Sequence, residues 1–353
     1  MKILIKAWRD LAHPLAGGSE RLVDTLASGL IERGHDVSLL AGGPVGEHRY
    51  RTIDAGGTYT QYVRGPLLER RLGRPDVVVD VANGMTYCTP LWRRRPTVLV
   101  VHHVHLDQWV TRFPAPVAAL GRAFERHVVP WVYRRSLFVA VSPSTADALS
   151  ELGVDERRIR IVHNAVDVRP VPTARSREPL FVVLGRLMPY KRVELALRAW
   201  PRVRSAVGGR LVVAGDGPDG PRLREMAPEG VEFVGHIPEA EKRGLLARAW
   251  LLVQTAMHEG WGVVITEAGA LGTPAIGFDV PGVRDAIVDG STGVLVEDED
   301  ELVETWVDLA TDPARRRELG ERAAEHACQF TPASTVERFV EVLEEAASGG
   351  GAR

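Results

Sequence analysis

The strongest constraint on the fold of this chain is a regular alternation of short apolar segments with longer amphipathic ones. The short segments have the length and β-branched content of strands, and the longer ones carry the periodicity of helices. Strands that are apolar on both faces are typical of a parallel sheet covered by helices. The first series of expected strands covers residues 2–7, 35–41, 76–81, 97–101, 137–142 and 158–162. The second series covers residues 180–185, 210–215, 231–235, 250–255, 274–278 and 293–296. The chain is therefore predicted to be an α/β protein with two doubly wound, Rossmann-like domains.

A polar, proline-rich segment, residues 167–179, separates the two series and is the expected linker. We therefore predict a first domain over residues 1–167 and a second over residues 178–328. Residues 329–353 are expected to carry a helix that returns to the first domain and packs on it through Phe339, Val342 and Leu343. The helical segments expected near the C-terminus cover residues 298–311, 313–328 and 332–347.

Charge and cysteine content exclude several classes of protein. The chain has 353 residues, and its formal net charge of -2 argues against nucleic-acid binding through bulk charge. Two cysteines, Cys88 and Cys328, are too few for a disulfide framework or a cysteine-rich zinc site. No apolar run reaches the roughly 18 residues of a membrane span, and the N-terminal run is too short for a signal peptide. The expected location is the cytoplasm.

Lysine is rare in this chain. Of the 44 basic residues only Lys2, Lys6, Lys191 and Lys242 are lysines, and the others are arginines. This bias resembles the codon usage of a GC-rich genome. A lysine far from the N-terminus then hints that a compact ammonium is needed at that position.

Loops that leave the carboxyl ends of parallel strands are where such sheets bind ligands. The loop after the first expected strand holds Gly17 and Gly18, just before a helix that Ser19 can cap and Gly34 can end. Glycines at a helix N-terminus let N–H groups approach an anion, although the pair also suits an ordinary turn. No G-x-G-x-x-G motif follows this strand, which disfavours a nicotinamide dehydrogenase.

The loop after the expected strand at 97–101 is rich in histidine. His102, His103 and His105 with Asp107 raise the possibility of a zinc site, but no second cluster of ligands has metal-binding spacing. A histidine at a strand end that hydrogen-bonds a polar ligand is the favoured interpretation.

The first strand of the second series is followed by LGRLMPYKR (184–192), in which Arg186 and Lys191 can reach one phosphate group. The alternative is a solvated helix start. A later loop, MHEGWGVVITEAG (257–269), places Glu259 in a glycine-rich turn and Glu267 in the following helix, which begins near Gly262. Such a helix start favours a phosphate, and the two carboxylates can hold sugar hydroxyls on either side of it.

In this order the motifs resemble those of retaining glycosyltransferases with the GT-B fold, the large family that includes sucrose synthase and bacterial mannosyltransferases. The Glu-x7-Glu element and the preceding G-R-L-x-x-x-K are its most specific parts. The matching segments run through nearly the whole chain and are AGGSER (16–21), HH (102–103), SPSTADAL (142–149), HNAVD (163–167), LGRLMPYKR, VAGDGP (213–218), VEFVGHIP (231–238), HEGWGVVITEA (258–268), GTPAIGFDVPGVRDAI (272–287) and DGSTGVLV (289–296).

The resemblance implies two domains that face each other across a cleft and a role for each matching residue. Arg186 and Lys191 would clamp the diphosphate of a nucleotide-diphosphate sugar, and Glu267 would hold its ribose hydroxyls. Glu259 would hold the hydroxyls of the donor sugar, and His102 would lie beside that sugar and the acceptor. The other residues that the resemblance places at the nucleotide-sugar site are Gly17, Gly18, Gly235, His236, Ile237, Gly260, Trp261 and Gly262. The chain departs from the commonest pattern at His103, Ala165 and Trp261, and none of these changes removes a catalytic group.

The resemblance also implies front-face attack with retention of anomeric configuration, in which the leaving phosphate takes the acceptor proton. Arg186 and Lys191 suit the charge that grows on that phosphate, so neither a metal nor a cofactor is expected. Three alternatives stay open: a sugar-nucleotide epimerase, a phosphorylase, and an inactive sugar-nucleotide-binding protein. A phosphorylase would need a lysine for pyridoxal phosphate, and the intact site argues against the inactive protein.

The acceptor, a small molecule or a glycoconjugate, is not readable from these motifs. Residues 112–136 carry an apolar stripe flanked by arginines, the pattern of a helix that lies on a membrane surface. A helix packed on its own sheet is the favoured interpretation, and peripheral membrane contact is the alternative. The stripe consists of Val117, Leu120, Phe124, Val128, Trp131 and Val132.

Overall fold

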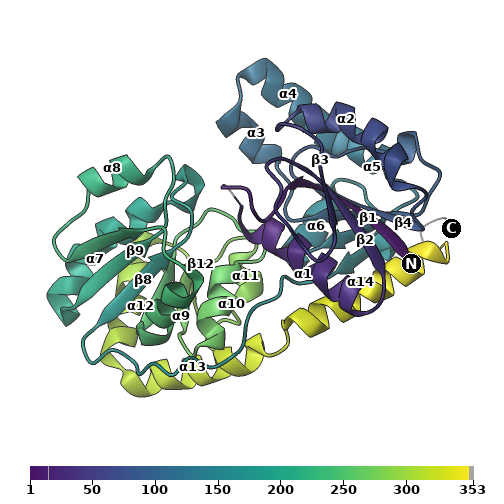
Figure 1. Cartoon of the computed structure of the whole chain (residues 1–353). Coiled ribbons are helices and arrows are strands. Elements are labelled where there is room, and N and C mark those ends of the chain that lie inside the picture. Colours follow the sequence, from purple (N-terminus) through teal and green to yellow (C-terminus); the bar gives the residue numbers. More distant parts are fainter. Residues whose placement is uncertain (15, 350–353) are drawn as a thin grey trace. The chain divides into compact units, whose positions relative to one another are not determined.

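The computed structural model describes residues 1–14 and 16–349, which form two compact units. The first unit combines Met1–Ala165 with the C-terminal segment that begins at Pro332, and the second is Val166–Thr331. Each unit is a parallel sheet with helices on its faces (Figure 1). The prediction of two doubly wound α/β sheets is confirmed. Residues 350–353 of the expected C-terminal region lie outside the described residues.

The sheet of the first unit has seven strands in the order β3-β2-β1-β4-β5-β6-β7. Its edge strand β3 was missed because it is short and exposed at both ends, and Ile53 is its one aliphatic residue. The central strands bury both faces, as their apolar sequences predict. The strands are β1 (Lys2–Arg9), β2 (Asp36–Gly42), β3 (Arg51–Asp54), β4 (Val77–Ala82), β5 (Thr97–Val101), β6 (Leu137–Ala140) and β7 (Ile159–Ile161).

The first helix begins two residues earlier than expected. Helix α1 (Gly18–Glu32) has Gly17 as its N-cap, and the Gly17 N–H donates to the Glu20 carboxylate over 2.8 Å. The expectation that Ser19 caps this helix is therefore wrong, because Glu20 already satisfies the exposed amide. The remaining helices before residue 165 are α2 (Thr60–Glu69), α3 (Leu106–Arg112), α4 (Ala115–Ala123), α5 (Val129–Val132) and α6 (Pro143–Glu151).

The last helix, α14 (Pro332–Ala347), packs against α1 and against β4 and β5, as predicted for the C-terminal segment. Phe339, Val342 and Leu343 are all buried there. The two helices approach closely at Gly29, where an added Cβ would lie 2.5 Å from a methyl carbon of Val336. The first unit is therefore completed by a segment that follows the whole second unit in the chain.

The segment 112–136 is not one continuous amphipathic helix. A π-helical stretch, Phe124–Val128, separates α4 from α5, and the Val129 N–H donates to the carbonyl of Phe124. Pro130, which has no N–H, follows directly, so regular α-helical bonding cannot continue through this point. The face that packs on the unit includes Ala118, Gly121, Val129 and Val132. The expected stripe is therefore split, and four of its members are exposed: Val117, Leu120, Val128 and Trp131.

The sheet of the second unit has six strands in the order β10-β9-β8-β11-β12-β13, and all six were predicted. The strands are β8 (Leu180–Leu184), β9 (Arg210–Ala214), β10 (Val231–Gly235), β11 (Leu251–Gln254), β12 (Ala275–Phe278) and β13 (Gly293–Val296). The helices are α7 (Val193–Val207), α8 (Gly220–Glu225), α9 (Glu239–Arg248), α10 (Val263–Ala270), α11 (Val283–Ala286), α12 (Glu299–Thr311) and α13 (Pro313–Ala327).

The proline-rich segment 167–179 is bound to the second unit. The Arg175 guanidinium donates to the carbonyl of Gly272, and the Ser176 N–H donates to the carbonyl of Arg248 over 3.0 Å. Trp250 donates its indole N–H to the carbonyl of Ser176 over 2.8 Å. Most of the expected linker is thus part of the second unit. The boundary between the two units lies between Ala165 and Val166.

Candidate functional site

The strand order of the second unit reverses between β8 and β11, which are neighbours in the sheet although β9 and β10 lie between them in sequence. In open parallel sheets, the loops on either side of such a reversal diverge and leave a crevice at the carboxyl ends of the strands. The loop after β8 carries Arg186 and Lys191, and the loop after β11 carries Glu259. The topology therefore brings these sequence-predicted residues to one place.

Backbone hydrogen bonds join these two loops. The Met257 N–H donates to the carbonyl of Tyr190 over 2.8 Å, and the Thr255 hydroxyl donates to the carbonyl of Lys191 over 2.9 Å. Arg192, in a left-handed conformation with φ of 47°, donates to the carbonyl of Thr255 over 3.0 Å. The carbonyls of Tyr190, Lys191 and Thr255 are therefore satisfied within the two loops, which fixes the backbone that carries Lys191.

Lys191 and Glu259 form a direct ion pair, in which the ammonium contacts Oε1 of the carboxylate. The Gln254 side-chain amide donates to the same oxygen over 3.1 Å. Burial alone would lower the pKa of Lys191, but the adjacent Glu259 carboxylate raises the pKa above its usual value. Arg186 is exposed on the same loop, and its charge opposes that rise. The loop thus presents two cations beside one carboxylate.

The turn that carries Glu259 rests on a second turn from the loop after β12. The Glu259 N–H donates to the carbonyl of Pro281 over 2.9 Å. Gly282 has φ of 79°, and an added Cβ would lie 2.1 Å from the carbonyl oxygen of Glu259. Only glycine fits at position 282, so Pro281 and Gly282 together fix the position of the Glu259 backbone.

The second carboxylate of the Glu-x7-Glu element is also held by a lysine. Helix α10 starts after Gly262, whose φ of 68° permits the sharp entry, and Glu267 lies in its second turn. Lys242 on α9 places its ammonium 2.7 Å from Oε1 of Glu267. Sequence reasoning gave Lys242 no role, although its rarity as a lysine was the same signal that singled out Lys191.

Two further predictions concern groups that already have partners inside the protein, the Trp261 ring and the backbone at Gly235 and His236. Trp261 is buried and packs edge-on against Phe330, with ring centroids 4.9 Å apart, so its indole ring is a packing element rather than a wall of the crevice. The His236 N–H donates to the Asp216 carboxylate over 2.7 Å, and the Gly235 carbonyl accepts from the Gly215 N–H over 2.7 Å. Backbone groups near Ile237 and Gly260 are therefore the better candidates for contact with a ligand.

In the first unit, the strand order reverses between β1 and β4, and His102 follows β5, the next strand along. His102 is buried, and burial followed by the charge of His105 lowers its pKa to about 4. Its imidazole is therefore neutral at physiological pH. Gly17 and Gly18 lie in the loop after β1, where the Gly17 N–H is already used by Glu20.

The other histidines of this loop have partners within the protein. Nε2 of His105 donates to the side-chain oxygen Oδ1 of Asn83 over 3.1 Å, and the backbone N–H of His105 donates to Glu125 over 2.7 Å. His103 lies 2.7 Å from the side-chain amide of Gln108. The side chain of Asp107 lies outside the described residues. These contacts favour a structural role for His103 and His105.

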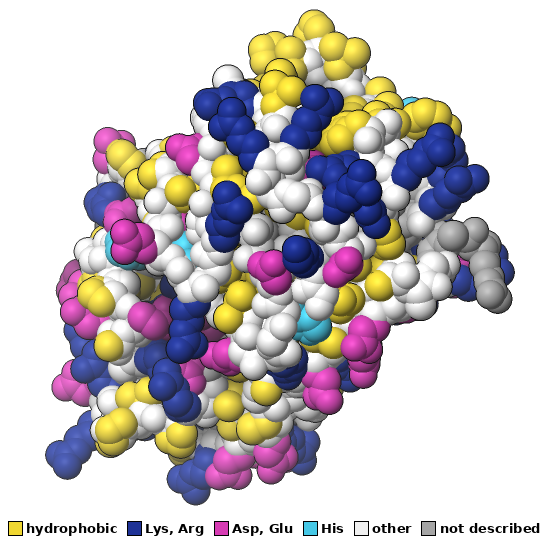
Figure 2. Space-filling model, turned by 45° about the vertical axis from the view of Figure 1, so that its right-hand side comes forward, with side chains coloured by type: hydrophobic (Ala, Val, Ile, Leu, Met, Phe, Trp, Pro, Cys, Tyr) yellow, Lys and Arg dark blue, Asp and Glu magenta, His cyan; other side chains and the backbone are white. Residues whose placement is uncertain are grey.

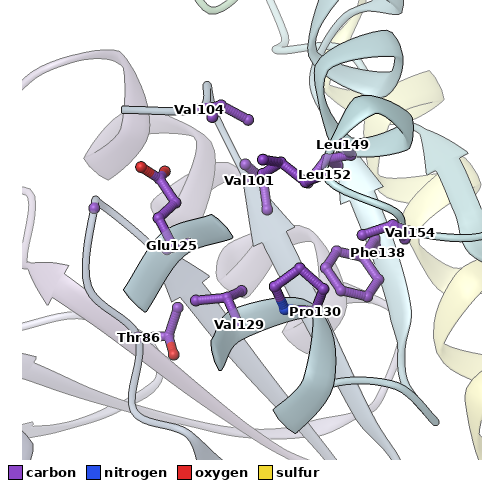
Figure 3. A pocket seen from close by; sticks show the side chains of 12 residues that line it. Thr86, Val101, Val104, Glu125, Val129, Pro130, Phe138, Leu149, Leu152 and Val154 are labelled. Carbon is purple, nitrogen blue, oxygen red and sulfur yellow. The ribbon is translucent and has the colours of Figure 1, made fainter. Parts of the chain in front are cut away.

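A small cavity lies behind the histidine loop, enclosed by β5, β6, α5 and α6 (Figure 3). Its lining is largely apolar, and the Glu125 side chain stands at one end of it in Figure 3. Its volume is about 20 Å³, room for about one water molecule, so it cannot hold a sugar. The candidate site is therefore made by the loops and not by this cavity.

Comparisons with known proteins agree with the fold of two parallel sheets. The family described as Glycosyl transferases group 1 matches residues 167–326, and the one described as Glycosyltransferase Family 4 matches residues 16–169. A glycogen synthase of Mycobacterium tuberculosis is 28% identical, with 83% of this chain and 82% of that protein covered. The 2-deoxystreptamine N-acetyl-D-glucosaminyltransferase of Streptomyces fradiae is 30% identical, with 80% of this chain and 75% of that protein covered. A crystal structure of HepE from Anabaena, in complex with UDP and glucose, has a TM-score of 0.79 at 17% identity and covers 98% of this chain and 100% of its own.

Proposed function

Because this chain belongs to the glycosyltransferases of group 1 and family 4, we propose that it moves a sugar from a nucleotide-diphosphate sugar to an acceptor hydroxyl. The observation that carries the proposal is the Lys191–Glu259 ion pair at the reversal between β8 and β11. An ammonium has three N–H donors, so Lys191 can contact Glu259 and a phosphate oxygen together. The structural neighbour that holds UDP and glucose supports a donor of this class.

In this proposal the second unit holds the donor. Arg186 and Lys191 contact the diphosphate, Glu259 accepts hydrogen bonds from the sugar, and Glu267 accepts them from the ribose. The N–H groups at the start of α10, after Gly262, face the same anion. Helix N-termini favour negative charge, and two fixed cations add to this without any side-chain rearrangement.

The transfer itself is proposed to retain the anomeric configuration. The acceptor oxygen bonds to the anomeric carbon on the face from which the phosphate leaves, and the released phosphate oxygen takes the hydroxyl proton. The products are the glycoside and a nucleoside diphosphate. Arg186 and Lys191 then stabilise the negative charge that grows on the leaving group. Neutral His102 can accept or donate one hydrogen bond without adding charge.

The donor class can be tested before any acceptor is known. UDP-, GDP- and ADP-sugars are added to the protein, and the melting temperature is measured. A true donor at 100 times its Kd stabilises by about 2.7 kcal/mol, or about 5 to 10 °C for a unit of this size. Arg198→Ala, an exposed residue paired with Glu299 outside the site, should keep the shift. Lys191→Ala should keep most of it, and Glu267→Ala, which removes the proposed acceptor for the ribose hydroxyls, should lose most of it. No shift with any nucleotide sugar would contradict the proposal.

Once an acceptor is found, product NMR tests the stereochemistry. We expect the anomeric configuration of the donor to be retained and the rate to be unchanged in EDTA. An inverted product, or activity lost in EDTA and restored by manganese, would contradict the proposed mechanism.

A second candidate, peripheral contact with an anionic membrane, is favoured by the exposed residues of α4 and α5. Leu120 is 73% exposed and Trp131 is 58% exposed. Arg122, Arg126 and Arg134 are exposed between and beside them, and hydrophobic and basic side chains lie together on the surface in Figure 2. Interfacial binding uses this combination of apolar and cationic side chains. None of the helices within residues 1–14 and 16–349 has the length and apolar character needed to cross a bilayer.

Vesicle sedimentation separates this candidate from a purely structural role for α4. We expect co-sedimentation with phosphatidylglycerol vesicles, less with phosphatidylcholine, and loss of it in the Leu120→Gln, Trp131→Gln double variant. Val288→Gln, on a similarly exposed apolar residue of the second unit, is the matched control. Equal recovery with all vesicles and variants would remove the candidate.

A further inference from the structure

Lys242 occupies an unusual position for a charged residue. It lies in the first turn and a half of α9, and only 7% of it is exposed. Its ammonium is 2.7 Å from Glu267 and 2.9 Å from Glu239, so it joins α9 to α10. Side-chain charges are seldom buried without a close partner, because desolvation of an isolated charge is costly. The close contacts of Lys242 with Glu239 and Glu267 therefore compensate for the burial of its charge.

The choice of lysine is informative in a chain that uses arginine for nearly all its positive charge. Lys191 and Lys242 each hold one carboxylate of the Glu-x7-Glu element, Glu259 and Glu267 respectively. The exposed ion pairs of the second unit, such as Arg198–Glu299 and Arg202–Asp300, use arginine instead. A compact ammonium contacts one carboxylate oxygen as a point charge, whereas a guanidinium fork would engage both oxygens.

We infer that Lys242 is a positioning residue that keeps Glu267 oriented for the two neighbouring hydroxyls of the donor ribose. This inference rests on the proposed function, in which Glu267 meets that ribose. The contact holds Oε1 of the carboxylate toward α9 and so limits the orientations of the side chain. A preoriented carboxylate binds hydroxyl groups more tightly than a mobile one, because less side-chain entropy is lost on binding. Lys242 thereby contributes to the preference for ribose over deoxyribose without touching the nucleotide.

The test compares ribonucleoside diphosphates with their 2′-deoxy counterparts. Binding of UDP, GDP, ADP and the three 2′-deoxy forms is measured by calorimetry on the whole protein. For the base that binds, the wild type should prefer the ribo form by about tenfold or more, because hydrogen bonds to a charged acceptor are strong. In Lys242→Met, which keeps the apolar stem, the preference should fall below about threefold while affinity for the deoxy form stays within about twofold.

Two further variants make the outcome specific. Lys242→Arg restores the charge and should recover part of the ribose preference, which a mere packing role would not predict. Glu241→Gln removes an exposed charge from the same helix and should leave the preference unchanged. If Lys242→Met does not fold, Lys242→Gln keeps a hydrogen-bond donor and gives the same comparison.

The two ways of failing are distinct. If folded Lys242→Met loses affinity for the ribo and deoxy forms by equal factors, or keeps the wild-type preference for the ribo form, the positioning role is wrong. The proposed function would then remain intact. If the wild type binds none of the six nucleotides, the proposed function fails and the inference fails with it.

Discussion

Three of the four lysines pair with carboxylates that are largely withdrawn from solvent. Lys6 and Glu69 are fully buried and 2.7 Å apart, and the largely buried Lys191 and Lys242 contact Glu259 and Glu267. Only Lys2, near the N-terminus, is exposed. The hint drawn from lysine rarity is matched by these contacts, in which each ammonium approaches a carboxylate as a point charge.

Lys191 and Arg186 should serve the transition state more than ground-state binding. Negative charge grows on the leaving phosphate, and fixed donors aimed at such charge contribute about 3–4 kcal/mol. We therefore expect Lys191→Ala and Arg186→Ala each to lower kcat by about 100- to 1000-fold. Lys191→Arg should lose at least about tenfold if a compact ammonium is required. Steady-state kinetics, with circular dichroism to confirm folding, measure this. Full activity in Lys191→Ala would remove the lysine from the mechanism.

His102 should make stability fall in mild acid. Its pKa is lowered to about 4 in the native state, whereas an unfolded histidine has a pKa of about 6.5. Between these values the unfolded chain binds a proton that the native chain does not, so stability decreases as pH falls from about 6.5 to 4. From pH 7 to 5 the expected loss from this residue is about 2 kcal/mol. Urea unfolding of the wild type and His102→Gln at both pH values gives the difference, and an equal pH dependence of the two proteins would contradict it.

At the scale of elements, the contact between α1 and α14 is tight enough to reverse the usual effect of a glycine substitution. Alanine normally stabilises a helix interior relative to glycine by about 1 kcal/mol. At Gly29, however, the new methyl would overlap Val336, and overpacking costs about 1–3 kcal/mol. Gly29→Ala should therefore lower the melting temperature, and Gly29→Ala with Val336→Ala should recover part of the loss.

Gly244 in α9 is the matched control, since nothing lies within 4 Å of an added Cβ there. Gly244→Ala should be neutral or stabilising by up to about 1 kcal/mol. If the Gly29→Ala protein is as stable as the Gly244→Ala protein, α1 and α14 can move apart without a loss of stability, and the prediction is wrong.

At the scale of the whole molecule, the two units should differ in their ability to fold alone. Residues 166–331 are continuous in sequence and contain two complete hydrophobic clusters, on the two faces of their sheet. We expect this fragment to unfold cooperatively and to bind the same nucleoside diphosphate as the full chain. Residues 1–165 lack α14, whose buried Val336, Phe339 and Leu343 each contribute about 1.5–3 kcal/mol, and should not fold stably. Thermal melts of both fragments decide this, and a stable 1–165 fragment with an unfolded 166–331 fragment would contradict it.

Much of the fold was predictable because its signals are local. Parallel strands that are buried on both faces must be apolar throughout, so β5 and β8 stand out from the sequence alone. The edge strand β3 is exposed and carries no such pattern, and the break between α4 and α5 depends on a π-helical turn beside Pro130. The periodicity of apolar residues in the sequence does not reveal a strand with little burial or an irregular turn within a helix.

The candidate site divides in the same way. Residue type and spacing within single segments predicted the two α/β sheets, the loops that carry Arg186, Lys191, Glu259 and Glu267, and membership of the glycosyltransferase family. The partners of these side chains depend instead on the tertiary structure, in which Lys191 pairs with Glu259, Lys242 contacts Glu267, and Trp261 packs inside the unit. These contacts join residues about 25 to 70 positions apart. Their formation depends on the order of strands in the sheet, which brings the loops after β8 and β11 together and is not encoded in any one of the segments.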